Sequence, residues 1–408
     1  MTKQDIIESA FRVWGRELYQ RTSLSQIAGD LGVTKPALYR HFHNKQALLD
    51  GMYESFFDDF AGFVKPEYER AIGAGDPTEG LLIMTRAIVR YYCLNQEAFI
   101  FSLVEVYGNR EPGNMARQLA LRGIGMRQMP RLEGEDAAYP PLIQLVITTV
   151  TFLVAHFHKF EHEFQAAPSE AEVEAVIASV EAKITHGLGL LPETVARIDF
   201  AGLEQRLSHA ALADIEDDGL LRAVAGAVAE AGPWNASMDM VARRSGLSKS
   251  GLYSHFKNRQ DMLRQFFITE VDRLVVYAEA GKRNSDIAEE QLYLAISAIA
   301  DYLRSRPEIL FAADWLRTRR IDLGVAIPPG IFRILADIRL SGPSGGGLTG
   351  DKAERISLWI LFLIVSTLCR GVRAPGTQIT GAEVAAVGNE SFRILYRFIG
   401  LGIKGFNG

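Results

Sequence analysis

The sequence predicts an all-α protein made of two similar halves. Three observations lead to this fold class: a stretch near the N-terminus recurs 214 residues later, apolar residues follow helical spacing, and no segment favours a strand. A long repeat decides whether one architecture is present or two copies of one. Here it indicates two copies.

The repeat pairs residues 32–49 with residues 246–263 without a gap. Nine of the 18 positions are identical, and they hold glycine, lysine, leucine, tyrosine, histidine, phenylalanine, asparagine, glutamine and leucine. Chance does not produce nine identities in 18 positions without a single gap. Whatever structure the first copy adopts is therefore expected again in the second.

The first copy and the residues before it predict a helix-turn-helix. Ser23 can cap a short helix, with Gln26 as its reciprocal partner in a capping box. Gly32 ends that helix, and Thr34 can cap a second one, in whose first turn Pro36 is tolerated. Leucine and phenylalanine four residues apart then point inward. The outward positions of the second helix are Lys35, Ala37, Tyr39, Arg40 and His41, a set suited to phosphates and base edges.

Both copies resemble the DNA-binding domain of the tetracycline-repressor (TetR) family of bacterial transcriptional regulators. The first copy matches through Ile6-Ile7-Glu8-Ser9-Ala10-Phe11, Thr22-Ser23-Leu24, Ile27-Ala28, Leu31-Gly32-Val33-Thr34, Leu38-Tyr39-Arg40-His41-Phe42 and Asn44-Lys45. The second matches through Leu220-Leu221, Gly232, Ser237-Met238, Val241-Ala242, Gly246-Leu247-Ser248, Leu252-Tyr253-Ser254-His255-Phe256 and Asn258-Arg259. The resemblance covers about 50 residues per copy. It implies that the partner is double-stranded DNA.

The residues expected to contact DNA lie in the two recognition helices and at the helix starts beside them. In the first head they are Thr22, Thr34, Lys35, Pro36, Ala37, Tyr39, Arg40, His41 and Lys45; in the second they are Ser248, Lys249, Ser250, Gly251, Tyr253, Ser254, His255 and Arg259. The two tyrosines could instead only pack, but a hydroxyl beside cations favours phosphate contact. Lys45 and Arg259 stand at helix starts, where a cation is unfavourable beside the positive end of the helix dipole. A phosphate bound there would compensate for that charge.

Composition and charge agree with a DNA-binding protein of the cytoplasm. The chain has 408 residues, 48% hydrophobic and 23% charged, as in globular proteins with real cores. Two cysteines without metal-type spacing and no secretory signal favour a reducing compartment. The net charge is −5, but residues 1–50 and 217–264 each carry +2, which leaves −9 on the rest. Positive heads on a negative body orient the molecule toward phosphates.

The predicted domains follow the repeat. They are a DNA-binding domain at 1–50, a helical body at 51–190, a linker at 191–218, a second DNA-binding domain at 219–264 and a second body at 265–408. In the first half, helices are expected over 3–18, from 45 to a stop at Pro66 or at the 73–77 cluster, and over 80–95, 99–107, 115–129, 142–164 and 170–190; in the second half, the two closing helices are expected over 351–372 and 380–401. The glycine-rich stretch 341–347 lacks the lysine and strand of a P-loop and is expected to be a plain loop. The most apolar segment, 358–368, is too short to cross a bilayer.

The resemblance also implies how the halves combine. In the family, the last two helices of each protomer form a four-helix bundle with those of its mate, so this chain can supply both protomers as a monomeric pseudo-dimer. Two chains exchanging halves, a homodimer, are the competing arrangement. The heads differ at Pro36/Ser250, Ala37/Gly251 and Arg40/Ser254, which predicts an operator with unequal half-sites rather than a palindrome.

A small-molecule effector, of unknown identity, is a further implication of the resemblance. Aromatic and methionine side chains of the bodies are the candidates for its pocket, although such residues at helical spacing are more often core. The candidates are Tyr92, Phe99, Tyr107, Met126 and Phe152 in the first half, and Tyr302, Trp315 and Trp359 in the second. Effector binding would release a repressor from DNA.

Other functions are weaker interpretations of the sequence. His156, His158 and His162 raise a metal hypothesis, but no cysteine joins them and a polar helix end explains them, so no metal or other cofactor is predicted. No catalytic pair or cofactor motif indicates an enzyme. The alternative is a ligand-binding or interaction protein of this fold with weakened DNA binding, for which Leu18 in place of the family's usual glycine counts slightly.

Overall fold

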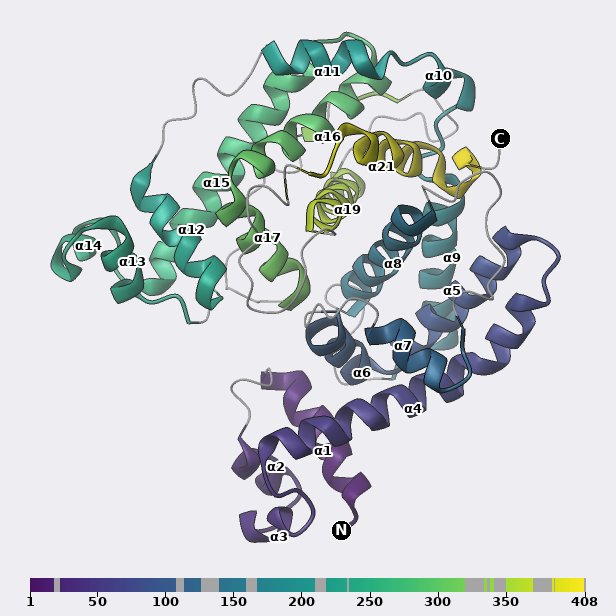
Figure 1. The fold of residues 1–408 in the computed structure, drawn as a ribbon, viewed down its shortest axis with the longest axis vertical. Helices are drawn as coiled ribbons and strands as arrows, with labels where there is room; N and C mark the ends of the chain where they lie inside the picture. Colours follow the sequence, from purple (N-terminus) through teal and green to yellow (C-terminus); the bar gives the residue numbers. More distant parts are fainter. Residues whose placement is uncertain are drawn as a thin grey trace. The chain divides into compact units, whose positions relative to one another are not determined.

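A computed structural model describes most of the chain as helices (Figure 1). The described residues are 1–17, 23–107, 114–125, 139–158, 167–209, 218–232, 235–319, 334–335, 338–340, 350–369, 384 and 386–406. Across these ranges every regular element is helical, which confirms the all-α class. None of the helices in this part of the chain combines the length and apolarity needed to cross a bilayer.

The chain forms two compact units. The first holds residues 1–132 and 153–181, and the second holds residues 133–152 and 182–408. The boundary crosses the helices α8 (Tyr139–His156) and α9 (Glu170–His186), so the second unit contains the start of α8 and the end of α9 together with the whole second half. Two segments of the first half therefore belong to the compact unit of the second.

The first unit begins with the predicted head and the long helix that follows it. Its helices, besides its parts of α8 and α9, are α1 (Lys3–Glu17), α2 (Leu24–Asp30), α3 (Lys35–Tyr39), α4 (Lys45–Ile72), α5 (Pro77–Leu94), α6 (Gln96–Phe101), the π-helix η1 (Ser102–Val106) and α7 (Asn114–Leu121). Helix α4 continues through Pro66 and is capped by Gly73, so a stop at the proline was the wrong alternative and a stop at the glycine cluster the right one. Val64 and Tyr68, buried on either side of the proline, hold the helix against the core.

Aromatic side chains join the head of the first unit to its body. The ring of Phe101 on α6 lies 5.1 Å from Phe11 and 5.2 Å from Trp14, both on α1, measured between ring centroids. The same ring lies 5.1 Å from Tyr53 and 5.6 Å from Phe56, both on α4. Such contacts add to the hydrophobic burial of the rings, so α1 and α4 are held on one side of the body.

Several predicted helix ends of the first half are corrected by backbone turns. The predicted helix over 115–129 ends at Leu121, because Gly123 takes φ +84°, a left-handed value that side chains disfavour. The predicted helix over 99–107 begins earlier, as α6, and turns into η1. The predicted helix over 170–190 ends at His186, where Gly187 and Gly189 take positive φ. Of the predicted 142–164 helix, residues 159–164 lie outside the described ranges.

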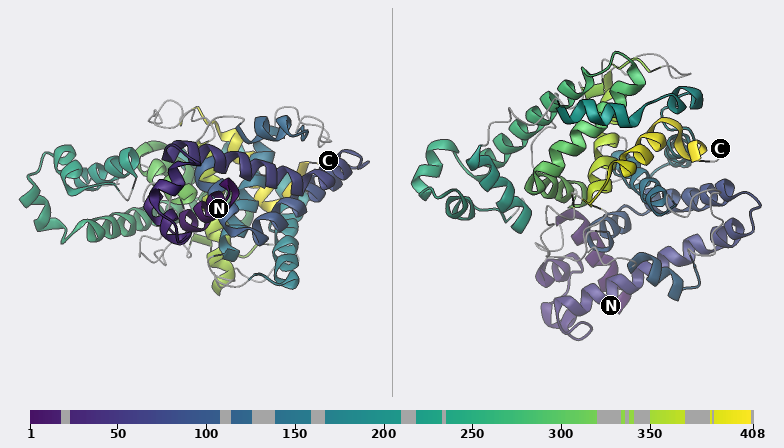
Figure 2. Two further views of the ribbon diagram at one scale, coloured as in Figure 1. Left: turned by 90° about the horizontal axis from the view of Figure 1, so that it is seen from below. Right: turned by 45° about the horizontal axis from the view of Figure 1, so that its top comes forward.

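The second unit repeats the same order of helices after two additional short ones. Its helices are α10 (Pro192–Ala196), α11 (Phe200–His209), α12 (Gly219–Ala231), α13 (Met238–Ser245), α14 (Lys249–His255), α15 (Arg259–Lys282), α16 (Ala288–Ser305), α17 (Pro307–Arg319), α19 (Gly350–Cys369), α21 (Asn389–Leu401) and the 3₁₀-helix η5 (Gly402–Phe406). Helix α21 starts at Asn389, after a turn at 386–388, so the helix predicted over 380–401 is interrupted there; residues 380–383 and 385 lie outside the described residues. Helices α12 to α14 lie at one end of this unit, away from α21 (Figures 1 and 2). The glycine-rich stretch 341–347 lies outside the described residues.

Helix α8 of the first half packs against α19 of the second half within this unit. Thr148 and Ser366 join their hydroxyls at 2.8 Å, and the indole N–H of Trp359 donates to the Thr149 hydroxyl at 3.1 Å. These groups are buried, and the two threonine hydroxyls also donate to carbonyls of their own helix, so the bonds across the halves use their remaining capacity. The closing helices of the two halves are therefore matched in polarity at this contact.

The end of α9 and the end of α21 meet backbone to backbone. The amide of Leu188 donates to the carbonyl of Ile399 at 2.7 Å, and that of Leu190 donates to Gly400 at 2.9 Å. A Cβ added at Gly187 would collide with the Ile399 carbonyl. Only glycine permits this approach, which ties the ends of the two closing helices together.

Helix α11 lies on the second body rather than spanning open space. Glu204 accepts two hydrogen bonds from the Arg393 guanidinium at 2.9 Å and one from the Tyr293 hydroxyl at 2.5 Å. Burial alone raises the pKa of Glu204, but the hydrogen bonds from Arg393 and Tyr293 outweigh it and hold the pKa below its ordinary 4.5. The ring of Phe200 packs edge-on against Tyr293, with centroids 4.7 Å apart. Residues before the second head are thus part of the second body's surface.

Candidate nucleic-acid interface

The first head forms the expected helix-turn-helix from α2 and α3. The Ser23 side chain accepts from the amide of Gln26 at 3.2 Å and the Gln26 side chain accepts from the amide of Ser23 at 2.6 Å, the reciprocal pair of a capping box. Gly32 follows at φ +66°, which turns the chain into α3. Thr34 takes the N-cap conformation of α3, but its side chain makes no capping hydrogen bond.

The second head repeats this arrangement with a longer recognition helix. Ser237 caps α13 by accepting from the amide of Met240 at 3.2 Å, and Gly246 takes φ +71° at the turn. Ser248 caps α14 by accepting from the amide of Gly251 at 3.0 Å. Helix α14, which has this cap, is seven residues long, whereas α3, which lacks a side-chain cap, is five residues long.

The two heads bury the same leucine in the recognition helix and the same phenylalanine just after it, and expose the same tyrosine. Leu38 and Phe42 are buried in the first head, as their counterparts are in the second. Tyr39 leaves 45% of its surface exposed and Tyr253 leaves 51%. A large aromatic side chain half open to solvent in both copies is available for contact with a partner.

The structure exposes most of the predicted DNA-binding residues of each head. Thr34, Lys35, Pro36, Tyr39, Arg40, Ser248, Lys249, Ser250, Tyr253, Ser254 and His255 are exposed, whereas Ala37, His41, Lys45, Gly251 and Arg259 are half-buried. Thr22 lies outside the described residues. The Asn44 side chain accepts from the amide of Ala47 at 2.7 Å, and the Asn258 side chain accepts from the amide of Asp261 at 2.9 Å. These caps fix the starts of α4 and α15 shortly after the recognition helices.

The cations on the two surfaces have different surroundings. Desolvation lowers the pKa of Lys45, although the Glu105 carboxylate opposes this shift. The ammonium of Lys35 lies 6.0 Å from the centre of the Tyr39 ring. Lys249, at the equivalent place in the second head, lies 3.1 Å from the Asp239 carboxylate of α13. Sequence reasoning missed this pairing, because residues ten apart on different helices have no shared periodicity.

The predicted effector residues lie in both bodies, and most of those that the structure describes are buried. Tyr92, Phe99, Phe152, Tyr302 and Trp359 are buried, Tyr107 is half-buried, and Met126 and the side chain of Trp315 lie outside the described part. Phe99 and Tyr92 pack edge to face, with centroids 5.4 Å apart, and Tyr302 donates to Glu270 at 2.7 Å. These three side chains therefore have partners within the core.

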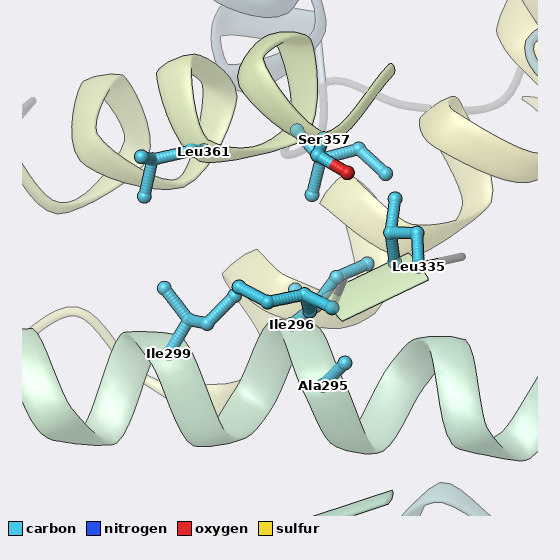
Figure 3. Close-up of a pocket in the computed structure, with 8 residues that line it drawn as sticks. Ala295, Ile296, Ile299, Leu335, Ser357 and Leu361 are labelled. Carbon is cyan, nitrogen blue, oxygen red and sulfur yellow. The ribbon is translucent and has the colours of Figure 1, made fainter. Parts of the chain in front are cut away.

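A small cavity lies elsewhere in the second body, between α16 and α19. Its volume is about 10 Å³, room for one water molecule. Its walls are Ala295, Ile296, Ile299, Ile334, Leu335, Ser357, Ile360 and Leu361. Figure 3 shows the Ser357 hydroxyl among these apolar side chains, and it has no hydrogen-bond partner in the described part of the chain. No regular spacing in the sequence distinguished these core residues from their neighbours.

The histidines considered for a metal are only partly described. His158 is buried, and its Nε2 lies 2.8 Å from the Tyr92 carbonyl oxygen. His162 lies outside the described residues. In the described ranges no group of three or more metal-binding side chains comes together.

Comparison with known proteins concentrates on the two heads. The family described as "Bacterial regulatory proteins, tetR family" matches residues 6–52 and 220–266. The HTH-type transcriptional regulator TtgR of Pseudomonas putida is 45% identical over 58 residues, as is the probable HTH-type transcriptional regulator ArpR of the same species. Each match covers 13% of this chain and 28% of the relative, so the chain spans under a third of these relatives.

A solved structure also aligns with part of the chain. It is the crystal structure of the TetR family transcriptional regulator PfmR from Thermus thermophilus, with 20% sequence identity and a TM-score of 0.30. The alignment covers 43% of this chain and 95% of that one.

Proposed function

We propose that the chain is a tandem regulator of the tetR type, which matches at both heads, and that it regulates transcription as a single-chain pseudo-dimer. Residues 1–50 and 219–264 are the two DNA-binding heads in this proposal, and residues 51–190 and 265–408 are the bodies. Each head binds one half-site of an operator. The observation that carries the proposal is the pair of recognition helices, each buried through leucine and phenylalanine and open to solvent through lysine and tyrosine.

Contacts between the two halves within the second unit support a pseudo-dimer. Thr148 and Thr149 of α8 bond with Ser366 and Trp359 of α19. These four buried groups belong to the closing helices, which in the family resemblance make the dimer. Because one chain supplies both sides of this contact, these four groups need no partner from a second copy.

Regulation by an effector is the remaining part of the proposal. In this proposal a small molecule binds in a body, favours one separation of the heads and releases a repressor from DNA, as the family resemblance implies. The ligand's difference in affinity between the two states, typically ~1 to 3 kcal/mol, limits how complete that release is.

DNA binding is tested by a fluorescence titration of the full chain on DNA from upstream of its own coding sequence. We expect affinity that falls linearly with the logarithm of salt concentration, because bound lysines and arginines displace counterions. The double variant Tyr39→Ala/Tyr253→Ala should lose most of this affinity, and Tyr39→Phe/Tyr253→Phe should show how much the hydroxyls contribute. Binding that ignores salt and both variants would favour an interaction protein with weakened DNA binding.

The operator's symmetry is tested by selection from random DNA. The heads differ at Pro36/Ser250, Ala37/Gly251 and Arg40/Ser254, so we expect two unequal half-sites separated by about one helical turn, ~34 to 36 Å, or a multiple of it. One full chain should bind each selected duplex. Recovery of a perfect palindrome, bound by two chains, would support exchange between chains instead.

A further inference from the structure

The two heads differ in a carboxylate that stands beside the recognition helix of only one of them. Ser23 and Ser237 cap equivalent helices, so Ser25 and Asp239 occupy the same place two residues beyond the cap. Asp239 is exposed on the first turn of α13, and its carboxylate oxygens lie 3.1 Å from the ammonium of Lys249. The first head has a serine hydroxyl where the second has a negative charge.

The lysine concerned is the one that both recognition helices share. Lys35 and Lys249 are each the first residue after an N-cap, Thr34 or Ser248. Within the described residues Lys35 forms no ion pair, and its ammonium lies over the Tyr39 ring. The hydrogen bond from Lys249 to Asp239 and the charge of that carboxylate raise the pKa of Lys249, so the lysine is cationic but already neutralised locally.

When the second head binds a phosphate through Lys249, either the Lys249–Asp239 pair breaks or the Asp239 carboxylate stays close to the phosphate. The gain from a lysine–phosphate contact comes largely from released counterions, and a lysine already paired with a carboxylate releases fewer. The uncovered carboxylate would also repel the phosphate backbone. Both effects act on the second head, since serine replaces the acid in the first.

We infer that Asp239 is an affinity-setting residue that weakens the second head by holding Lys249, so that the first head anchors the protein and the second reads its half-site from there. This inference rests on the proposed DNA binding. It assigns the operator contacts an order of strength: the phosphate beside Lys35 contributes more than the phosphate beside Lys249.

The test is a set of salt-dependent binding titrations of the full chain on one duplex of its upstream DNA. Asp239→Ser, which installs the first head's residue, should tighten binding about three- to ten-fold at about 0.1 M salt and steepen the log–log salt slope by about one. Asp239→Asn keeps the shape without the charge and should act in the same direction. The matched change Ser25→Asp should weaken binding and flatten the slope.

Lysine variants identify the cause. Lys35→Ala should reduce the slope by about 0.9, whereas Lys249→Ala should reduce it by less than half of that until Asp239→Ser is also present. Equal losses from the two lysine variants, or an unchanged slope in Asp239→Ser and Asp239→Asn, would overturn the inference while DNA binding stands. If neither the parent chain nor any variant binds DNA in a salt-dependent way, the proposed function fails and the inference fails with it.

Discussion

The two bodies place different chemistry at equivalent positions of one helical framework. Phe56 and Glu270 each stand 12 residues after the asparagine that caps their helix. In the following helix, Tyr91 stands four residues before Asn95, the C-cap of α5, and Tyr302 stands four residues before Arg306, the C-cap of α16. One body surrounds this place with aromatic rings, and the other with buried charges.

In the first body the surroundings of Phe56 are apolar. Phe56 is 1% exposed, and its ring centroid lies 5.1 Å from that of Phe57, 5.8 Å from Phe60 and 5.6 Å from Phe101. Such packing has little directional requirement, so it tolerates small shifts of the helices.

In the second body the contact is ionic and hydrogen-bonded. Glu270 is 4% exposed, and it accepts from Tyr302 at 2.7 Å and from Arg273 at 2.9 Å, with Arg306 at 3.3 Å. Arg306 also donates to the Tyr302 hydroxyl at 3.0 Å. Burial, together with the Glu270 charge, raises the pKa of Tyr302, which therefore stays a protonated donor. Removing Glu270 from this cluster would therefore leave the other three side chains without their shared acceptor.

Helix caps and helix lengths thus preserve the duplicated backbone, while the side chains of its interior have changed. A buried ion pair offsets its desolvation cost only when all partners are in place, whereas an aromatic cluster loses stability one ring at a time. The second body is therefore expected to fail more abruptly than the first when one member of its cluster is removed.

The largest effect is expected from Glu270→Ala. This change leaves the buried Arg306 guanidinium without its carboxylate, which should lower the free energy of unfolding by about 3–5 kcal/mol. Urea unfolding followed by far-UV circular dichroism measures the loss. Asp272→Ala, on the exposed face of the same helix, is the control and should stay within about 0.5 kcal/mol of the parent. Similar small losses from both variants would show that the ionic cluster does not stabilise the second body.

The all-α class and the duplicated plan could be predicted from the sequence because their signals are local. Ser23 with Gln26, and Asn44 at the start of α4, act through hydrogen bonds within a single turn, and the structure forms them. The early end of α7 depends on Gly123 at φ +84°, a value that the surrounding chain sets. Glycines are frequent enough that the sequence alone did not single this one out.

The interface residues divide in the same way. Tyr39 is recognised by its place in a motif, and its exposure agrees with the proposed role. Asp239 acts through a partner on another helix, and Glu270 pairs with Tyr302 and Arg306 beyond its own helix, so these pairings leave no periodic signal. Aromatic residues such as Tyr92 and Tyr302 show the limit of composition, because the same residue types fill a core or line a pocket.

A smaller effect, and the sharper test of the comparison, is expected from giving the second body the first body's residues. Glu270→Phe/Arg306→Asn removes the two most buried charges of the cluster together, and the remaining cation, Arg273, is the one more open to solvent. Replacing a buried ion pair by packed apolar groups is often neutral or stabilising by about 1–4 kcal/mol, and Tyr302 then loses its acceptor, which costs about 1–3 kcal/mol. The two terms nearly cancel, so we expect an unfolding free energy within about 2 kcal/mol of the parent in the same urea experiment. A loss as large as that of Glu270→Ala would mean that the second body has become specific for its charged interior and that the two cores are no longer interchangeable.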